Sequence, residues 1–220
     1  MNRLLEYFLS LPKTLYFNFR CLPLRKAIRL PYVVRYDTDL QVDNWGGVIS
    51  NFNPQFHIVH IGFSTVPVCD KKTTTVFKIS SQGSIIFNGK MALGHGSKIC
   101  AHGTISFGAG SGISSDGNIY CYDKISIGDN CSISWGVLLM DSDSHTIQGL
   151  DGSDVETKKP IIVGNHVWLC YGVTVLKGAI IPDNCVVGTN SLVKGTDFKS
   201  NTIIIGSPAK SKKEIAGWRV

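Results

Sequence analysis

Aliphatic residues recur at a fixed step of six through the C-terminal half of the chain. This column consists of Val163, Leu169, Val175, Ile181, Val187 and Val193. A second column, of small or compact residues, follows four positions later at Val167, Val173, Ala179, Cys185 and Ser191. A step of six matches neither the 3.6-residue period of a helix nor the simple alternation of a strand. We therefore interpret each hexapeptide as a short strand followed by a turn.

The same step extends upstream, interrupted by steps of eight. Its positions are Ile79, Ile85, Met91, Ile99, Ile105, Ile113, Ile119, Ile125, Ile133 and Leu139. We interpret the longer steps as two-residue bulges at corners. One hexapeptide cannot bury its apolar residue alone, whereas stacked coils close a continuous core. The pattern predicts an all-β fold, a parallel β-helix of hexapeptide repeats. The alternative, a β-sandwich, does not explain a sixfold phase.

The ends of the chain lack the clear repeat. Residues 1–36 predict a helical, basic segment in which Leu4 to Leu9 form an apolar face and Pro12 ends or kinks the helix. Residues 37–213 are assigned to the β-helix domain, with irregular early coils. Residues 214–220 are a C-terminal tail.

The aliphatic column fails between Leu139 and Val163, where His145, Asp151 and Thr157 stand in phase. The intervening segment 140–160 is rich in Asp, Ser, Gly and Lys, which predicts a loop that leaves the prism. Long loops on a rigid scaffold commonly carry functional sites. We therefore look for chemistry in this loop.

Charge and cysteine content narrow the class of protein. The formal net charge is +6, but the cations gather at both ends and leave the middle nearly neutral, so no nucleic acid partner is predicted. The seven cysteines form no CxxC pair, which indicates a reducing, cytoplasmic setting without a zinc knuckle. The apolar run Leu4–Leu11 is interrupted by Glu6 and is too short to span a bilayer, so we expect neither secretion nor a transmembrane anchor. The 23 glycines indicate many tight turns.

Several motifs together resemble the hexapeptide-repeat acetyltransferases. They are the hexapeptides from VGNHVW at 163–168 to VGTNSL at 187–192, the preceding Asp143-Ser144-His145, and GSPAK at 206–210. The nearest subgroup resembles the maltose, galactoside and polysaccharide O-acetyltransferases, over about residues 79–213. The resemblance implies a left-handed β-helix, a homotrimer with active sites between neighbouring prisms, and acetyl-CoA as co-substrate with no metal required.

The resemblance also assigns His145 as the general base that takes the proton of the acceptor hydroxyl. An imidazole titrates near neutral pH, which suits this task. Asp143 and Asp141 are candidates to orient its ring, and a backbone carbonyl is the alternative.

In this family CoA lies along the outside of the late coils. The implied contacts are Trp168, Cys170, Tyr171, Gly188, Thr189, Lys194 and Lys210. Relatives often have small residues where Cys170 and Tyr171 stand, and a Thr-Lys pair where Lys194 and Gly195 stand. For Trp168, packing between subunits is an equal alternative. A covalent route through Cys170 is disfavoured because no base is placed for it.

Acceptor contacts are expected from residues 114–123 of the neighbouring subunit. Asp116, Asn118 and Asp123 offer hydroxyl-binding groups there, although each could instead cap a turn.

The sequence favours an acetyl-CoA-dependent O-acetyltransferase that acts on a sugar or a surface-polysaccharide precursor. An N-acetyltransferase acting on an amino-sugar nucleotide or amino acid remains open, as does a non-catalytic β-helix assembly protein. A γ-type carbonic anhydrase would need three converging histidines. His95 and His102 are seven residues apart and His166 is remote, so that arrangement is not evident.

The basic, aromatic stretch from Phe17 to Arg29 allows two interpretations. It is either a helix packed on the first coil or on the trimer, which we favour, or an element that meets a membrane surface or glycolipid. The second would add weak association with the inner membrane surface to a cytoplasmic protein.

Overall fold

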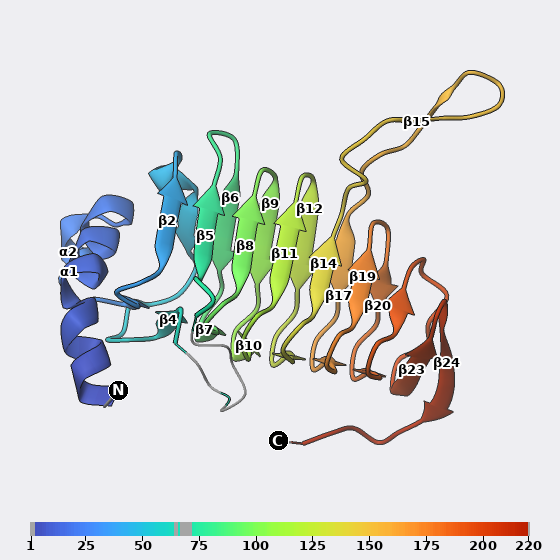
Figure 1. Cartoon of the computed structure of the whole chain (residues 1–220). Helices are drawn as coiled ribbons and strands as arrows, with labels where there is room; N and C mark the ends of the chain where they lie inside the picture. Colours follow the sequence, from blue (N-terminus) through green and yellow to red (C-terminus); the bar gives the residue numbers. More distant parts are fainter. Residues whose placement is uncertain (1–2, 64–65, 67–71, 220) are drawn as a thin grey trace.

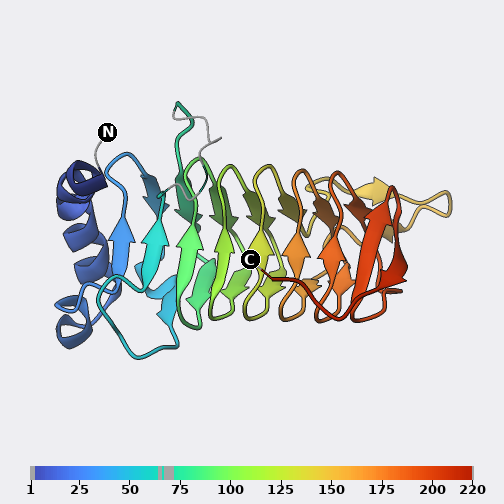
Figure 2. The same cartoon turned by 90° about the horizontal axis from the view of Figure 1, so that it is seen from below.

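The computed structural model describes residues 3–63, 66 and 72–219. They form a prism of stacked coils, with two helices at one end and the last two strands at the other (Figures 1 and 2). One of the seven cysteines, Cys69, lies outside the described residues. None of the helices in these ranges has the length and hydropathy needed to cross a membrane.

Three sheets form the long faces of the prism, and the chain visits them in turn. Sheet A contains β1 (Tyr32–Val34), β4 (Val59–Ile61), β7 (Met91–Leu93), β10 (Ser111–Ile113), β13 (Ser132–Ile133), β18 (Trp168–Leu169), β21 (Val186–Val187), β23 (Thr202–Gly206) and β24 (Ala209–Glu214). Sheet B contains β2 (Asp39–Val42), β5 (Val76–Ile79), β8 (Lys98–Ala101), β11 (Asn118–Cys121), β14 (Leu138–Met140), β19 (Thr174–Leu176) and β22 (Leu192–Val193). Sheet C contains β3 (Val48–Ser50), β6 (Ser84–Phe87), β9 (Thr104–Phe107), β12 (Lys124–Ile127), β17 (Ile161–Val163) and β20 (Ile180–Ile181). Neighbouring strands are parallel, except for β23 with β24.

The predicted columns fill the interior of the prism. All six residues of the column from Val163 to Val193 are at most 2% exposed, and the compact column from Val167 to Ser191 is buried to the same degree. The upstream aliphatic residues are also buried. In the third coil the column runs through Leu93 rather than Met91, because Leu93 pairs with Ile113. In sheet C it runs through Phe107 and Ile127 rather than Ile105 and Ile125, because Ile127 pairs with both Phe107 and Val163. The prediction of a hexapeptide-repeat core is confirmed.

Strand pairing locates the two extra residues of the early coils. Ile99 pairs with Ile119, twenty residues on, whereas Val175 pairs with Val193, eighteen residues on. The additional residues lie at the corner from sheet B to sheet C, where Ala101 and Cys121 point into the core. They lie at a corner, but at another one than predicted: the eight-residue steps run from Ile99 to Phe107 and from Ile119 to Ile127, not from Ile105 to Ile113 or from Ile125 to Ile133.

Glycine is required where coils stack at the corner between sheets C and A. A Cβ on Gly108 would lie 2.3 Å from the backbone of Gly128, and a Cβ on Gly128 would lie 2.5 Å from the carbonyl oxygen of Gly164. Real Cβ atoms do not approach backbone so closely. This stacking accounts for part of the high glycine content.

Helix α1 (Arg3–Cys21) crosses the end of the prism, followed by the short α2 (Leu24–Ala27). Of the two alternatives for Pro12, that it ends the helix is wrong, because α1 continues through it to Cys21. Phe17 inserts into the first coil, with its ring centroid 5.2 Å from that of Tyr32 and 5.7 Å from that of Phe77. A 3-10 turn, η1 (Trp45–Gly47), lies beside it, and the Phe17 and Trp45 rings are 5.6 Å apart.

Candidate active site

The predicted loop leaves the corner between sheets B and C after β14 and returns to the prism at β17. Its outer part is a hairpin of β15 (Ile147–Gln148) and β16 (Asp154–Val155), which projects far from the prism (Figure 1). The loop is thus a large insertion at the corner where early coils already carry two additional residues. Exposed apolar side chains, Ile147, Leu150 and Val155, lie on the hairpin.

His145 lies on the outgoing limb of this loop and is exposed. Within the described ranges its ring makes no hydrogen bond, ion pair or ring contact. The preceding Ser144 has a positive φ of 61° and donates its backbone N–H to the Ser142 hydroxyl at 3.0 Å. The imidazole therefore lies on the surface of the chain, where another molecule can contact it.

The two aspartates near His145 have other partners. Asp141 is fully buried, and its carboxylate accepts hydrogen bonds from the backbone N–H groups of Tyr122 at 2.7 Å and Asp123 at 2.9 Å. Asp143 forms an ion pair with Lys177, which also donates to the Glu156 carbonyl at 2.6 Å. Lys177 therefore ties both limbs of the loop to the prism. Neither carboxylate is bonded to the His145 ring.

Trp168 lies on sheet A, the face opposite the corner from which the loop emerges. It is 37% exposed, and its indole N–H donates to the Ser134 hydroxyl at 3.1 Å. The structure therefore does not bring Trp168 and His145 together within one chain.

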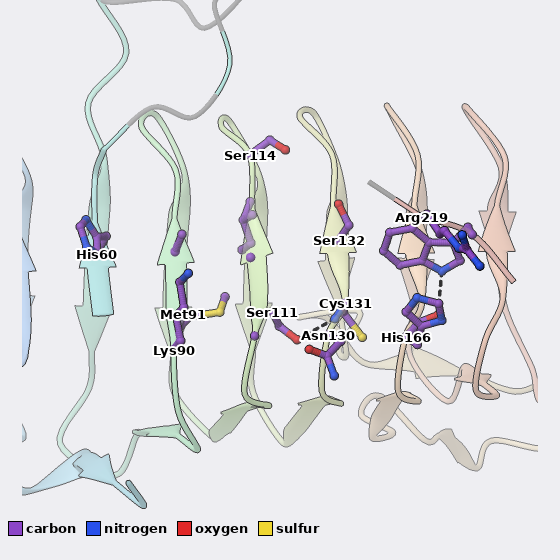
Figure 3. Close-up of a pocket in the computed structure, with 15 residues that line it drawn as sticks. His60, Lys90, Met91, Ser111, Ser114, Asn130, Cys131, Ser132, His166 and Arg219 are labelled. Atoms are coloured by element: carbon purple, nitrogen blue, oxygen red, sulfur yellow. Dashed lines mark hydrogen bonds between the residues drawn. The ribbon is translucent and has the colours of Figure 1, made fainter. Parts of the chain in front are cut away.

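A groove of about 770 Å³ runs along sheet A toward Trp168. Its floor is a row of outward positions paired from strand to strand, in which Ala92, Gly112 and Ser132 are small. Trp168 pairs with Ser132 and follows the last of these small residues, although it does not itself line the groove. Figure 3 shows the groove, with His60 and Lys90 toward one end and His166 and Arg219 toward the other.

The C-terminal tail covers one end of this groove. The Trp218 indole stacks on the His166 ring at 4.5 Å, and its N–H donates to the His166 carbonyl at 2.8 Å. His166 is half-buried, and its Nδ1 lies 2.8 Å from the Asn184 side-chain oxygen. Trp218 was missed because the tail carries no repeat. The only sequence feature that could have indicated it is an aromatic residue that follows the GSPAK motif at 206–210.

The residues expected to contact CoA are spread over the late coils. Thr189, Lys194 and Lys210 are exposed, and Gly188 is half-buried. The Tyr171 ring lies 5.4 Å from that of Trp135. A Cβ on Gly188 would lie 2.4 Å from the Ile205 side chain, so a larger residue there would disturb β23.

The surroundings of Cys170 do not favour a reaction in which its thiol is acylated. Burial raises the pKa of its thiol, which lowers the fraction of nucleophilic thiolate at neutral pH. Burial and the nearby Asp141 carboxylate raise the pKa of Cys121 as well. The six cysteines that the structure describes are all free thiols.

The residues expected to contact the acceptor have local partners. Asp116, with a positive φ of 46°, accepts a hydrogen bond from the Thr73 hydroxyl at 3.1 Å. The Asn118 amide lies 3.4 Å from the Asp116 carbonyl. Asp123 is exposed and borders a shallow hollow of about 450 Å³ shared with Thr146 and the returning limb of the loop. Asp123 is thus the member of this group that lies beside the loop.

The described residues do not form a cluster of side chains that could bind a metal ion. No group of three or more His, Cys, Asp or Glu side chains lies close enough to hold an ion among the residues in the three described ranges. His95 is buried and its Nδ1 lies 2.8 Å from the Arg35 guanidinium, a cation that disfavours a metal at this nitrogen.

Comparisons with known proteins place the chain in a family, although no family model matches it. It is 31% identical over 147 residues to WbbJ of Escherichia coli (strain K12), whose name assigns it provisionally to lipopolysaccharide biosynthesis as an O-acetyl transferase. That match covers 62% of this chain and 74% of the relative. A polysialic acid O-acetyltransferase of Neisseria meningitidis is 45% identical over 56 residues, a quarter of each protein (25% and 26%).

The fold agrees with the sequence matches. The crystal structure of NeuO, described as a polySia-specific acetyltransferase, superposes with a TM-score of 0.52 at 21% identity and covers 86% of this chain and 79% of that one. The prism is a left-handed parallel β-helix. A relative of this identity and coverage, together with the shared fold, establishes the membership: the chain belongs to the hexapeptide-repeat acetyltransferase family.

Proposed function

We propose that the chain transfers the acetyl group of acetyl-CoA to a hydroxyl of a sugar or surface-polysaccharide precursor in the cytoplasm. The observation that carries the proposal is the exposed imidazole of His145 on a polar loop held to the prism by Asp141 and Lys177. The names of the relatives in E. coli and N. meningitidis support O-acetyl transfer and a saccharide acceptor.

In the proposed reaction His145 acts as general base. Its imidazole takes the proton of the acceptor hydroxyl while the hydroxyl oxygen forms a bond to the thioester carbonyl carbon. The tetrahedral intermediate then collapses, the carbon–sulfur bond breaks, and the CoA sulfur takes the proton from the imidazolium. No acyl-enzyme forms, which agrees with the raised pKa of Cys170.

We propose that the active site is assembled between two subunits of a homotrimer. His145 and Trp168 lie on opposite sides of one prism, and the hairpin carries exposed apolar residues well outside it. A hairpin that reaches a neighbouring prism would bury those residues and bring His145 to the Trp168 end of the sheet A groove. Trp168, Cys170, Tyr171, Gly188, Thr189, Lys194 and Lys210 are the proposed CoA contacts.

For the acceptor we retain Asp123 as the leading candidate, because it is exposed beside the loop. Asp116 and Asn118 remain proposed contacts, but their side chains also stabilise a turn. The neighbouring subunit would supply these groups.

The test is acceptor-dependent release of CoA thiol from acetyl-CoA with a panel of sugars, nucleotide sugars and amines. We expect release with a saccharide hydroxyl and a decrease of at least about a hundredfold in His145→Ala, on the scale of a lost general base. His57→Asn is the matched control, because His57 has a positive φ of 55°, which asparagine tolerates, and lies in an early coil.

Undiminished release in His145→Ala would contradict the role of His145. Release with amines alone would indicate the N-acetyltransferase instead. A wild-type protein that releases no thiol with any acceptor would favour the non-catalytic assembly protein.

A further inference from the structure

The outer surface of α1 is apolar although the helix is already docked. Five apolar side chains form a stripe along it at spacings of three and four residues: Leu4, Phe8, Leu11, Leu15 and Phe19. Phe8 is 72% exposed and Phe19 is 48% exposed. Leu24 of helix α2 is 66% exposed, and Ile28, which follows the helix, is 62% exposed. An exposed apolar patch of this extent marks an interaction surface.

The inner surface of α1 explains why the apolar side faces outward. Ser10, Thr14 and Asn18 lie along the side that meets the open edge of β1. The Asn18 amide donates to the Tyr32 carbonyl at 2.7 Å, and the Thr14 hydroxyl accepts from the Val34 N–H at 3.0 Å. The Ser10 hydroxyl accepts from the Tyr36 N–H at 3.1 Å. These polar side chains and the buried Phe17 dock the helix, so its outward apolar stripe is not needed to hold it on the prism.

The segment that carries the stripe is strongly basic. Between residues 3 and 29 the chain carries six cations, Arg3, Lys13, Arg20, Arg25, Lys26 and Arg29, against one carboxylate, Glu6. Glu6 is itself paired with Arg35. Residues 3–29 therefore carry a formal net charge of +5. Arg25 and Lys26 are exposed beside Leu24 and Ile28.

We propose that the α1–α2 end of the prism binds the surface of an anionic lipid bilayer. An amphipathic helix that lies in the plane of the membrane surface buries its apolar side among the acyl chains, while flanking cations attract anionic headgroups. The stripe and its cations meet both requirements. A rotationally symmetric trimer would present three such surfaces at the same end, which strengthens attachment by multivalency.

The experiment is flotation of the full-length protein with vesicles of phosphatidylglycerol and phosphatidylcholine in equal parts, with pure phosphatidylcholine vesicles as the uncharged comparison. We expect the wild type to float with the anionic vesicles and much less with the neutral ones. Phe8→Gln with Phe19→Gln should reduce flotation at least tenfold. Arg25→Gln with Lys26→Gln should also reduce it, most strongly at low salt concentration, where the attraction of these cations to anionic headgroups is least screened.

Ile162→Gln with Ile180→Gln is the matched control, because these two paired residues of sheet C are 41% and 39% exposed and lie far from α1 along the prism. This variant should float like the wild type. Circular dichroism and light scattering on each variant show that fold and molecular mass are retained.

Wild-type protein that stays in the aqueous fraction overturns the proposal. Equal flotation of wild type and the Phe8/Phe19 variant overturns it as well. A fall in molecular mass of that variant, without vesicle binding by the wild type, would assign the stripe to contact between copies of the chain. Flotation measures no acetyl transfer, so its outcome is independent of the proposed function.

Discussion

Asp141 occupies an inward position that is apolar in the preceding coils. Cys121 and Ala101 pair with each other in the same column, and Asp141 follows Cys121 after one more coil. All three are fully buried. The Asp141 carboxylate accepts the two backbone N–H groups of the preceding corner and lies 3.3 Å from the Cys121 sulfur. A buried carboxylate is tolerated here because its oxygens have donors.

We therefore predict that Asp141→Asn destabilises the fold by about 1–3 kcal/mol, because an amide NH2 would face a backbone N–H that has lost its acceptor. Asp143→Asn, which removes a partly exposed ion pair, should cost less than about 1 kcal/mol. Thermal unfolding at one protein concentration measures both. Equal costs for the two variants would contradict the structural role of Asp141.

The burial of Asp141 could have been predicted in part from the sequence. The twenty-residue step between early coils places Asp141 above Cys121, so its burial could have been predicted from the register. The proximity of Asp141 and Asp143 to His145 in sequence drew attention to orientation of the imidazole instead. Lys177 gave no signal, because its contact with both limbs of the loop depends on the path of a segment without a repeat.

Helix α1 and strand β1 are matched in spacing. Ser10, Thr14 and Asn18 are four residues apart along the helix, and their partners Tyr36, Val34 and Tyr32 are two residues apart along the strand. Four helical residues rise about 6 Å and two strand residues span nearly the same length. The helix thus satisfies the open edge of the first coil, which would otherwise invite pairing with another chain.

Asn18→Ala should lower the free energy of unfolding by about 1–3 kcal/mol, since it leaves both the N–H and the carbonyl of Tyr32 buried without a partner. Asn51→Ala, which removes an exposed side-chain bond to Asn88, is the control and should change stability by less than about 0.5 kcal/mol. Denaturant unfolding at a fixed protein concentration compares them. An Asn18 variant as stable as the control would contradict edge protection.

The repeat made the coils predictable, because each hexapeptide carries its own apolar signal. The docking of α1 was not predictable in the same way. An apolar stripe on a helix normally marks the side that packs. Here the packed side carries three polar residues, which meet unpaired backbone, and one fully buried apolar residue, Phe17.

At the scale of the whole molecule, the separation of His145 and Trp168 across one prism makes a sharp test of assembly. We predict that His145→Ala and Trp168→Ala are each inactive alone and that trimers assembled from equal amounts of both regain activity. A site that takes His145 from one subunit and Trp168 from its neighbour is intact in about a quarter of random arrangements.

The measurement is CoA-thiol release after the two variants are coexpressed, with each variant expressed alone as the control. Mixed trimers that stay inactive would mean that both residues act within one chain. An active Trp168→Ala variant would remove Trp168 from the site.

The stack of coils also sets the distance between the α1–α2 end of the prism and the loop that carries His145. The loop with His145 leaves after β14, the fifth strand of sheet B, so it stands four strand spacings above the first coil, on the order of 20 Å. If the α1–α2 end rests on a bilayer, the rigid prism becomes a spacer between the lipid and the reacting hydroxyl. Sugar units next to the lipid would then lie below the reach of the imidazole, and acetyl groups would be confined to units farther out along a membrane-tethered glycan.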